Sequence, residues 1–367
     1  MNNIVLYRKY RPRKFSEVVG QEHVVKTLTN SILGNNISHA YLFSGPRGSG
    51  KTTLARLFAK SVNCENRAGA EPCNKCSSCL EIMENRSIDL IEIDAASHRG
   101  IDDVRELREG VKFAPAKSKY KVFIIDESHQ LTKDAANALL KTIEEPPAHA
   151  VFLLATTEAH KMIPTIVSRC QRFDFRRLQT SEIIKKLEFI AKKESVKFDE
   201  SALALIALNA RGSFRDAESL LDQCMNFSRG TDSVSAREIK DLLGIVEVGQ
   251  IAEFVDFLIA KNASGAVLSV GSFADNGADL QEFAKTLIFY LRQSLLLKIN
   301  PDFPNPQNSG LSVQELEKIK AQTAGLSQKE IRNMLELFVD AENKIKYSAI
   351  SQLPLELAII NITHQES

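Results

Sequence analysis

The stretch "AYLFSGPRGSGKTTLARLFAKSV", residues 40–62, decides the fold that we expect for this chain of 367 residues. An apolar run of the kind that forms a buried strand leads into "GPRGSGKT" (45–52). This segment fits the pattern G-x-x-x-x-G-K-[ST], and a helical pattern follows it. Glycines let successive backbone N–H groups turn inward around phosphate oxygens at a helix N-terminus. Strand, loop and helix together therefore predict a phosphate-binding loop rather than a chance glycine-rich turn.

The side chains of this loop indicate how it would hold a nucleotide. Lys51 would reach the β- and γ-phosphates, and the Thr52 hydroxyl would bind Mg²⁺. The other predicted nucleotide-binding residues of the loop are Gly45, Pro46, Arg47, Gly48, Ser49, Gly50 and Thr53.

Five apolar runs of strand type occur within residues 1–178, with helical patterns between them. Two runs, which contain "VFII" and "VFLLA", are apolar on both faces, as strands are when helices cover both sides of a parallel sheet. The alternation predicts an α/β domain with a parallel sheet flanked by helices. The runs are "AYLFSG" (40–45), "IDLIEID" (88–94), "YKVFIID" (120–126), "VFLLATT" (151–157) and "CQRFDF" (170–175).

Acidic and hydroxyl side chains end two of these runs. An ATPase with a phosphate-binding loop also needs an acid for the metal and a group that orients the attacking water. We predict that Asp126 holds Mg²⁺ through water and that Glu127 positions or deprotonates the hydrolytic water. At the end of the next run, Thr156 or Thr157 could sense the γ-phosphate, and each could equally be a strand-end hydroxyl bonded to backbone.

Four of the six cysteines follow the pattern C-x8-C-x2-C-x2-C. Thiolates at such short spacings suit a closed, tetrahedral, structural Zn²⁺ site, although an iron–sulfur cluster also fits four cysteines. The loop has little core of its own, so a metal would supply its folding energy. We interpret the other two, Cys170 and Cys224, as small buried side chains. The cluster consists of Cys64, Cys73, Cys76 and Cys79.

Only helical patterns remain after about Leu178. Short ones continue to about residue 243, and longer ones follow, including residues 278–299. Ser312 with Glu315 and Ser327 with Glu330 have the spacing of capping boxes that begin two late helices.

Length and charge exclude some classes of protein. A chain of 367 residues is longer than a single core usually supports, so two or three domains are expected. The net charge of +1 gives no global attraction to nucleic acid or membrane, so any DNA contact needs a local basic patch. No apolar run is long enough to span a bilayer, and the N-terminus lacks a signal-peptide core. We therefore expect a cytoplasmic protein without a membrane partner, whose cysteines are thiols or metal ligands.

In their order along the chain, the motifs resemble one family, the γ/τ subunits of the bacterial DNA polymerase III clamp loader, which are AAA+ ATPases. The resemblance covers roughly residues 1–243 motif by motif, and the helical remainder fits by length and character. Besides the phosphate-binding loop and the cysteine cluster, the motifs are "LYRKYRPRKFSEVVGQEHV" (6–24), "EIDAAS" (92–97), "IIDESH" (124–129), "ANALLKTIEEPP" (136–147), "FLLATT" (152–157), "SRC" (168–170) and "GSFRDAESLLDQ" (212–223).

The resemblance implies three domains. Residues 1–178 would form an AAA+ ATPase domain with an inserted zinc module at 64–79. Residues 179–243 would form a small helical lid domain, and residues 244–367 an all-α collar domain for oligomerisation.

The resemblance also implies roles for single residues. Thr157 matches a first sensor of the γ-phosphate, and Arg215 matches a second sensor, a lid arginine that reaches the γ-phosphate of its own chain. Arg169 would act in trans on the ATP of a neighbouring subunit, as arginine fingers do, and would then lack a partner within its own chain. Arg11 and Val19 are expected to line the adenine pocket.

The implied function is that of an ATP-driven motor. Members of the family hydrolyse ATP at subunit interfaces, open the sliding clamp and load it onto primer–template DNA. The expected partners are δ- and δ′-type subunits in a hetero-pentamer, the clamp and the DNA, with the polymerase core and helicase reached through an extension absent here. ATP, Mg²⁺ and structural Zn²⁺ are the expected cofactors. The family is catalogued within DNA polymerase, yet we see no polymerase active site in this sequence.

Two basic stretches are candidates for contacts with the DNA backbone. Arg99, Arg105 and Arg108 lie on or just before the helical pattern "IDDVRELREGVKFA" (101–114), whose acidic residues also fit a solvated, salt-bridged helix. The second stretch, for which the nucleotide is a competing partner, consists of Arg8, Lys9, Arg11, Arg13 and Lys14.

Two alternative functions are considered. A branch-migration or helicase-type AAA+ motor is disfavoured by the cysteine insertion and by the SRC motif. A non-hydrolysing organiser subunit of the clamp loader is disfavoured by the intact Lys51, Thr52, Asp126 and Glu127.

Overall fold

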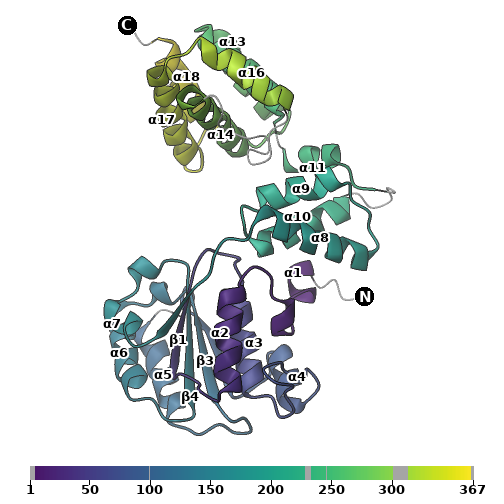
Figure 1. Ribbon diagram of the computed structural model, residues 1–367. Helices are drawn as coiled ribbons and strands as arrows, with labels where there is room; N and C mark the ends of the chain where they lie inside the picture. The colour runs from purple at the N-terminus through teal and green to yellow at the C-terminus, as the bar shows by residue number, and fades with distance from the viewer. Residues whose placement is uncertain (1–4, 99, 228–232, 245, 301–312, 365–367) are drawn as a thin grey trace. The chain divides into compact units, whose positions relative to one another are not determined.

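The computed structural model describes residues 5–98, 100–227, 233–244, 246–300 and 313–364 (Figure 1). The chain folds as two compact units that divide between residues 235 and 236. Helix α11, Ala236–Leu243, therefore belongs to the second unit, whereas the expected lid domain extends to residue 243. Arg99 and Ser312, which figure in the sequence-based expectations, lie outside the described residues.

A five-stranded parallel sheet forms the centre of the first unit, with the strand order β2-β3-β4-β1-β5 (Figure 1). All five expected strands are present, and the carboxyl ends of neighbouring strands meet at one edge: Ser44 pairs with Thr156 on one side and Asp174 on the other. The strands are β1 (Ala40–Ser44), β2 (Leu90–Asp94), β3 (Lys121–Asp126), β4 (Ala150–Thr156) and β5 (Gln171–Asp174).

Helices cover both faces of the sheet, as the sequence predicts. Successive residues of a strand point to opposite faces. In β1, Tyr41 and Phe43 join one hydrophobic cluster with α2 (Glu22–Leu33) and α3 (Lys51–Val62). Ala40 and Leu42 join another with α5 (Ile101–Val111) and α6 (Lys133–Glu144) (Figure 1). Burial on both sides explains why the two central runs have no polar face.

Shorter elements complete this part of the first unit. They are α1 (Leu6–Lys9), η1 (Phe15–Glu17), α4 (Ser77–Met83), η2 (Ser128–Gln130), η3 (Ala159–Lys161) and α7 (Pro164–Val167).

Three further helices of the first unit pack against one another: α8 (Thr180–Glu194), α9 (Glu200–Asn209) and α10 (Phe214–Phe227). Two backbone hydrogen bonds tie them to the sheet domain. Leu178 donates to the carbonyl of Gly212 over 3.2 Å, and Phe214 donates to the carbonyl of Gly48 over 3.1 Å. The start of α10 therefore lies beside the loop that follows β1.

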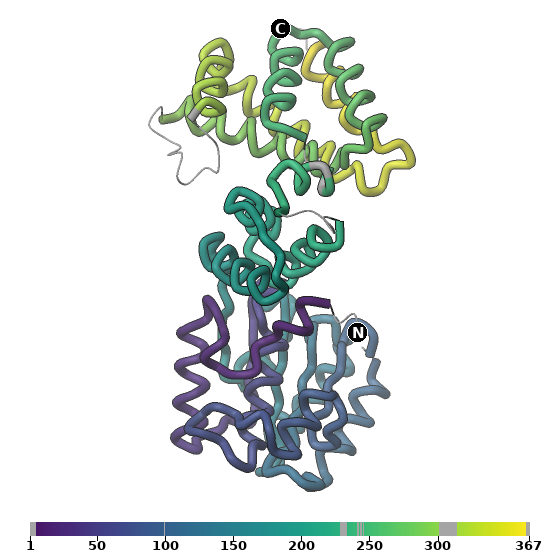
Figure 2. The backbone as a smooth tube through the Cα atoms, turned by 90° about the vertical axis from the view of Figure 1, so that its right-hand side faces the viewer, coloured from purple at the N-terminus to yellow at the C-terminus, as the bar shows by residue number. Residues whose placement is uncertain are grey.

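The second unit is entirely helical in its described residues, and Figure 2 traces its backbone. Its core includes Phe254 and Phe283, whose rings meet edge to face with centroids 5.2 Å apart. The expected capping box is confirmed at Ser327 and Glu330. Besides α11, the helices are α12 (Val248–Ile259), α13 (Ala263–Asp275), α14 (Leu280–Ile299), α16 (Val313–Ala324), α17 (Gln328–Ile345) and α18 (Leu353–Thr363).

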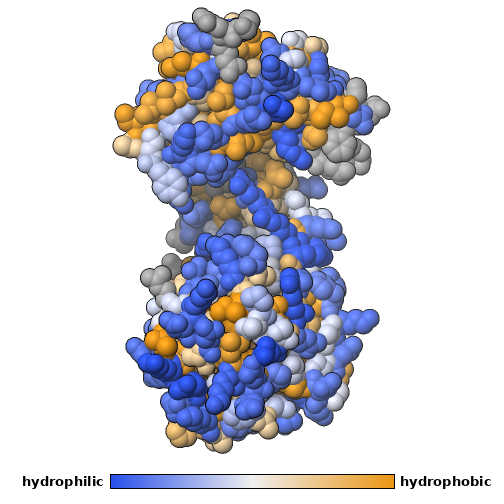
Figure 3. Space-filling model, turned by 90° about the vertical axis from the view of Figure 1, so that its left-hand side faces the viewer, coloured by the Kyte–Doolittle hydropathy of each residue, from blue (hydrophilic) through white to orange (hydrophobic). Residues whose placement is uncertain are grey.

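The surface carries hydrophilic and hydrophobic side chains side by side on the face of each unit drawn in Figure 3. Among the described helices, none combines the length and the apolar character that crossing a membrane requires.

Candidate nucleotide and metal sites

The loop between β1 and α3 has the backbone that a phosphate cradle needs. Gly48 and Gly50 have φ angles of +73° and +96°, in a region that favours glycine. A Cβ at Gly45 would lie 2.5 Å from the carbonyl oxygen of Phe175, and one at Gly48 would collide with the Ser213 side chain. Phe175, which follows β5, and Ser213, which precedes α10, therefore approach this loop too closely for larger residues at either glycine position.

Lys51 is held inside the loop. Its side chain is buried, and Nζ donates to the carbonyl oxygens of Gly45 and Pro46 over 2.7 and 2.8 Å. Burial lowers the pKa of Lys51, while the negative charges of Glu127 and Asp126 act in the opposite direction. The ammonium group is thus hydrogen-bonded to two neutral carbonyl oxygens, which phosphate oxygens can replace.

The two predicted magnesium ligands lie next to each other. The Thr52 hydroxyl donates to Oδ2 of Asp126 over 2.7 Å, so the helix after the loop and the end of β3 present their oxygen atoms to one point. Oxygen ligands of this kind are those that Mg²⁺ takes in nucleotide sites. The donor set therefore fits this ion.

The two threonines at the end of β4 have different hydrogen-bond partners. The Thr157 hydroxyl donates to Oε2 of Glu127 over 2.8 Å. The Thr156 side chain is fully buried, and its oxygen accepts a hydrogen bond from the backbone of Glu158 over 3.1 Å. Thr156 is thus bonded at the strand end, whereas Thr157 contacts the predicted water-activating acid.

His129 is a neighbour of this acid that the sequence analysis did not select. Its side chain is only 3% exposed, and Nδ1 lies 3.5 Å from Oε2 of Glu127 and 3.0 Å from the Thr156 hydroxyl. Its Nε2 lies 3.1 Å from a carboxylate oxygen of Glu158. The only signal in the sequence was its position two residues after Glu127.

A cavity of about 280 Å³ lies between the phosphate-binding loop, the N-terminal segment and the lid helices. Arg215 reaches its wall, with its guanidinium carbon 5.0 Å from the centroid of the Tyr7 ring. Burial lowers the pKa of Arg11, and the charge of Arg56 adds to the effect, so the cavity suits an anion. The predicted nucleotide-binding and catalytic residues that line the cavity are Arg11, Val19, Arg47, Gly48, Ser49, Gly50, Lys51, Thr52, Thr53, Asp126, Glu127 and Arg215.

Arg169 does not line this cavity, and one expectation about it was wrong. It has a partner in its own chain: Nη2 lies 2.7 Å from Oε1 of Glu144, the last residue of α6. Nη1 donates to the carbonyl of Thr165 over 2.8 Å and to the hydroxyl of Ser168 over 3.1 Å. The acid stands 25 positions earlier in the chain, and the fold brings α6 and α7 together. Any role in trans requires the guanidinium to exchange Glu144 for another anion.

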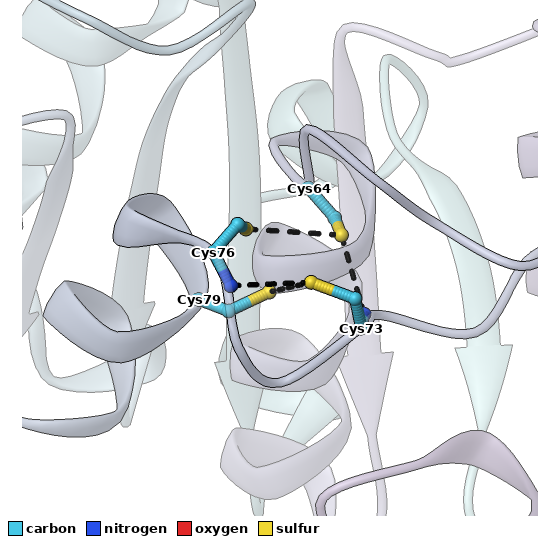
Figure 4. A group of neighbouring side chains, drawn as sticks. All are labelled: Cys64, Cys73, Cys76 and Cys79. Carbon is cyan, nitrogen blue, oxygen red and sulfur yellow. Dashed lines mark hydrogen bonds between the residues drawn. The ribbon is translucent and has the colours of Figure 1, made fainter.

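The four cysteines of the cluster converge. Figure 4 shows their sulfur atoms pointing toward one another from the loop after α3 and from α4, and all four lie within 4.8 Å of one another. The Cys64–Cys76 and Cys73–Cys79 sulfur pairs are 4.0 and 3.9 Å apart. A tetrahedral zinc ion with Zn–S bonds of about 2.3 Å separates its sulfur ligands by about 3.8 Å. The observed spacing fits this geometry.

The backbone around the cluster favours a thiolate at Cys73, whereas burial raises the pKa of Cys64 and Cys79. The N–H groups of Lys75 and Cys76 point at the Cys73 sulfur over 3.4 and 3.3 Å, and they lower the pKa of Cys73 to about 6. Asn74, which directly follows Cys73, has a φ of +59°. Its side chain accepts from the buried Lys60, which also donates to the carbonyl of Arg13 over 2.9 Å. The loop is thereby tied to the N-terminal segment.

The remaining cysteines lie apart from the cluster. Cys224 is buried, as predicted. Cys170 is partly buried against the sheet, and burial raises its pKa to about 12.

Neither candidate DNA contact gains support from the geometry. On α5, Arg105 pairs with Asp102 over 3.0 Å and Arg108 with Glu109 over 3.6 Å, as in a solvated, salt-bridged helix. In the N-terminal stretch, Lys9 pairs with Glu194 over 2.6 Å. Within that stretch Arg13 and Lys14 are exposed, and the assignment of this run to DNA stays a prediction.

Family models match three successive parts of the chain. Residues 20–179 match the model described as DNA polymerase III, delta subunit. Residues 182–230 match the DNA polymerase III clamp loader subunit, ATPase lid domain. Residues 234–367 match DNA polymerase III subunits gamma and tau domain III.

Among solved structures, the RuvB Holliday junction branch migration motor of Thermotoga maritima resembles this chain with a TM-score of 0.50. The likeness covers 90% of each chain at 18% sequence identity. At that identity it shows a shared fold.

Curated relatives extend over almost the whole chain. The tau subunit of DNA polymerase III from Bacillus subtilis is 41% identical over 100% of this chain and 65% of its own length. The tau subunit from Escherichia coli is 42% identical over 82% of this chain and 46% of its own length. This chain thus spans less than two thirds of both tau subunits. The gamma subunit from Buchnera aphidicola is 34% identical over 99% of both chains. The chain therefore belongs to the family of DNA polymerase III gamma and tau subunits.

Proposed function

We propose that this chain is an ATP-driven motor subunit of a DNA polymerase III clamp loader. It binds and hydrolyses ATP at subunit interfaces, opens the sliding clamp and loads it onto primer–template DNA. The observation that best supports the proposal is the position of Glu127. This acid shares a cavity with Lys51 and with the Thr52–Asp126 pair, and Thr157 holds it through a hydroxyl hydrogen bond.

Phosphate binding would rest on the loop after β1. Lys51 would exchange the carbonyls of Gly45 and Pro46 for oxygens of the β- and γ-phosphates, and the backbone N–H groups of the loop would donate to the same chain of phosphates. Thr52 and Asp126 would hold Mg²⁺, which when bound offsets charge on the phosphates.

Water activation falls to Glu127. Its carboxylate would accept a proton from the attacking water, and Thr157 would keep that carboxylate in place. Arg215, on α10, would reach the γ-phosphate from the lid and so couple the lid to the nucleotide.

Arg169 would act in trans. The Arg169 side chain is 37% exposed in the ion pair with Glu144, so a phosphate of a neighbouring subunit can compete for its guanidinium. Charge on the transferred phosphoryl group would then be stabilised by a residue of another chain, and hydrolysis would depend on assembly.

The four cysteines would hold a structural Zn²⁺ ion. Four thiolates leave no open coordination position, so the metal would stabilise the loop at residues 64–79 without taking part in hydrolysis.

Domain roles and partners follow from the family. We assign residues 1–178 to the ATPase domain, 179–243 to the lid and 244–367 to a collar that joins subunits. The partners would be δ- and δ′-type subunits, the clamp and primer–template DNA, and the polymerase core and helicase would be reached through a longer form. As a replication subunit, the protein would act in the cytoplasm.

ATP turnover by the purified chain, alone and with its partner subunits, clamp and primed DNA, tests the proposal. Clamp with primed DNA should stimulate turnover, whereas a translocating motor should respond to DNA alone. Lys51→Ala should abolish turnover because it removes the cation that binds the β- and γ-phosphates. Unchanged turnover in Lys51→Ala would rule out the motor function and would favour a non-hydrolysing organiser.

A further inference from the structure

Glu218 is a buried carboxylate in the wall of the nucleotide cavity that the proposed mechanism does not use. It lies on α10, lines the cavity and is only 7% exposed. It makes no hydrogen bond and no close ion pair with any of the residues that the structure describes. Because Glu218 lines the cavity and has no partner among these residues, its carboxylate can accept a hydrogen bond from a ligand bound there.

The surroundings of Glu218 leave the cost of its burial largely uncompensated. Lys186 on α8 and Arg11 in the N-terminal segment are the charges that favour its ionised form. Burial outweighs both and raises the pKa of the carboxyl to about 7. A ligand that donates a hydrogen bond would offset this desolvation.

The position of Glu218 along α10 indicates which end of a nucleotide it meets. The helix begins at Phe214, whose N–H donates to the carbonyl of Gly48 in the phosphate-binding loop. Arg215 and Glu218 are three residues apart and share a face of the helix, with Arg215 nearer the loop. From Phe214 to Glu218 the helix advances by about 6 Å, which would place Glu218 beyond the phosphates, on the nucleoside side of the cavity.

The adjoining wall suits a flat, apolar group. Val18, Val19 and Leu178 line the same cavity as Glu218. Pockets of this kind bind a ring by apolar contact and use a few polar groups to select its edge. The Glu218 carboxylate adds an acceptor to this wall, to which the amino group of a heterocycle can donate, with the ribose hydroxyls as competing donors.

We infer that Glu218 selects the base of the nucleotide by accepting a hydrogen bond from the 6-amino group of adenine. When the Glu218 carboxyl is ionised it can only accept hydrogen bonds, so a purine with a carbonyl at this position would present an acceptor to an acceptor and would be disfavoured. The inference rests on the proposed ATP-binding function and adds to it a residue that determines base specificity.

Calorimetric titration of the full chain at pH 8, where the Glu218 carboxyl is mostly ionised, with three nucleotides tests this assignment. The probes are ATP, purine riboside triphosphate, which lacks the 6-amino group, and 2′-deoxy-ATP, which lacks a ribose hydroxyl. The unsubstituted chain should bind purine riboside triphosphate about tenfold to a hundredfold more weakly than ATP, and 2′-deoxy-ATP nearly as well as ATP. This comparison needs no variant, so a misfolded variant cannot obscure it.

Substitution of Glu218 should remove the discrimination. Glu218→Leu should bind ATP and purine riboside triphosphate equally, while Glu218→Gln, which keeps an acceptor oxygen, should still prefer ATP. Asp216→Asn is the matched control, because Asp216 is an exposed acid of the same helix that does not line the cavity.

Three results would overturn the inference. The first is equal binding of ATP and purine riboside triphosphate by the unsubstituted chain. The second is a preference for ATP over purine riboside triphosphate that persists in Glu218→Leu. The third is that Glu218→Leu removes a preference for ATP over 2′-deoxy-ATP and leaves the preference over purine riboside triphosphate unchanged. Failure of the unsubstituted chain to bind ATP at all would instead reject the proposed function, and the inference with it.

Discussion

Thr157 donates its hydroxyl hydrogen to Oε2 of Glu127 over 2.8 Å, and its backbone N–H lies 3.3 Å from the same oxygen. The end of β4 thereby holds the acid at the end of β3. Glu127 itself has a φ of +46°, an uncommon conformation for a residue with a side chain. The ends of two neighbouring strands thus fix the position of the Glu127 carboxylate.

Thr157→Val should reduce ATP turnover about a hundredfold and leave ATP affinity nearly unchanged, since the hydroxyl positions Glu127 and does not hold the phosphates. Steady-state turnover and equilibrium binding measured on the same preparation separate the two effects. Thr156→Val is the matched control: it should lower stability, because that hydroxyl is fully buried and hydrogen-bonded, while turnover per folded molecule persists. If Thr156→Val lost turnover while Thr157→Val lowered only stability, Thr156 would be the residue that positions Glu127.

Arg169→Ala should leave ATP binding by the isolated chain intact and lower turnover of the assembled complex by a factor on the order of 10³. Mixing Arg169→Ala chains with Lys51→Ala chains should restore part of the turnover, because one class of interface then combines an intact loop with an intact arginine. Arg172→Ala, which removes another exposed arginine three positions along the chain, serves as a surface control. Loss of nucleotide binding by isolated Arg169→Ala chains would exclude the trans role.

Removal of metal should destabilise the first unit. The purified chain should contain one zinc ion, and a strong chelator should lower its Tm by about 5–10 °C because the loop at residues 64–79 depends on the metal for its folding. Cys76→Ser should show both effects, whereas Cys170→Ser, outside the cluster, should keep the metal. Metal analysis measures the zinc content, and thermal denaturation measures the change in Tm. Bound iron together with visible absorption would instead indicate an iron–sulfur cluster.

Glu218 should make stability depend on pH. Its folded-state pKa of about 7 lies above its ordinary value of 4.5, so the folded state keeps this proton to higher pH than the unfolded state does. The contribution is present in full below about pH 4.5 and is lost as pH rises through 7, at a cost on the order of 3 kcal/mol above that range.

Urea denaturation at pH 5 and pH 8 measures this effect. Glu218→Gln should gain stability relative to the unsubstituted chain at pH 8 and little at pH 5, because the amide does not ionise. Asp216→Asn, at an exposed position of the same helix, should show no such difference between the two pH values. Parallel pH profiles for the unsubstituted chain and Glu218→Gln would contradict the shifted pKa.

Features that depend on local sequence were predictable. The phosphate-binding loop, the cysteine spacing and the five strands each follow from neighbouring residues, and the structure brings Lys51, Thr52, Asp126 and Glu127 together at one edge of the sheet. Parallel strands place their carboxyl ends at the same edge, so strand order did not have to be known to expect this meeting.

Features that depend on distant partners were not predictable. The ion pair between Arg169 and Glu144 forms only because α6 and α7 pack together, and no spacing in the sequence reveals it. Glu218 looks like an ordinary charged residue of an amphipathic helix, and only the packing of α1 and α8 against that helix buries it. The choice between Thr156 and Thr157 required the positions of His129 and Glu127.

Glu71 lies inside the loop that the four cysteines close, and its carboxylate accepts hydrogen bonds from the backbone N–H groups of Phe15 and Ser16 over 2.8 and 2.9 Å. Val18 and Val19, just beyond, line the nucleotide cavity. Folding of the loop and binding of the nucleotide therefore share one segment of chain, and two equilibria that share a segment are thermodynamically linked. If metal binding raises the affinity for the nucleotide by some factor, nucleotide binding raises the affinity for the metal by the same factor. Under the proposed zinc and ATP assignments, loss of the metal would be transmitted to the nucleotide cavity through these two backbone hydrogen bonds.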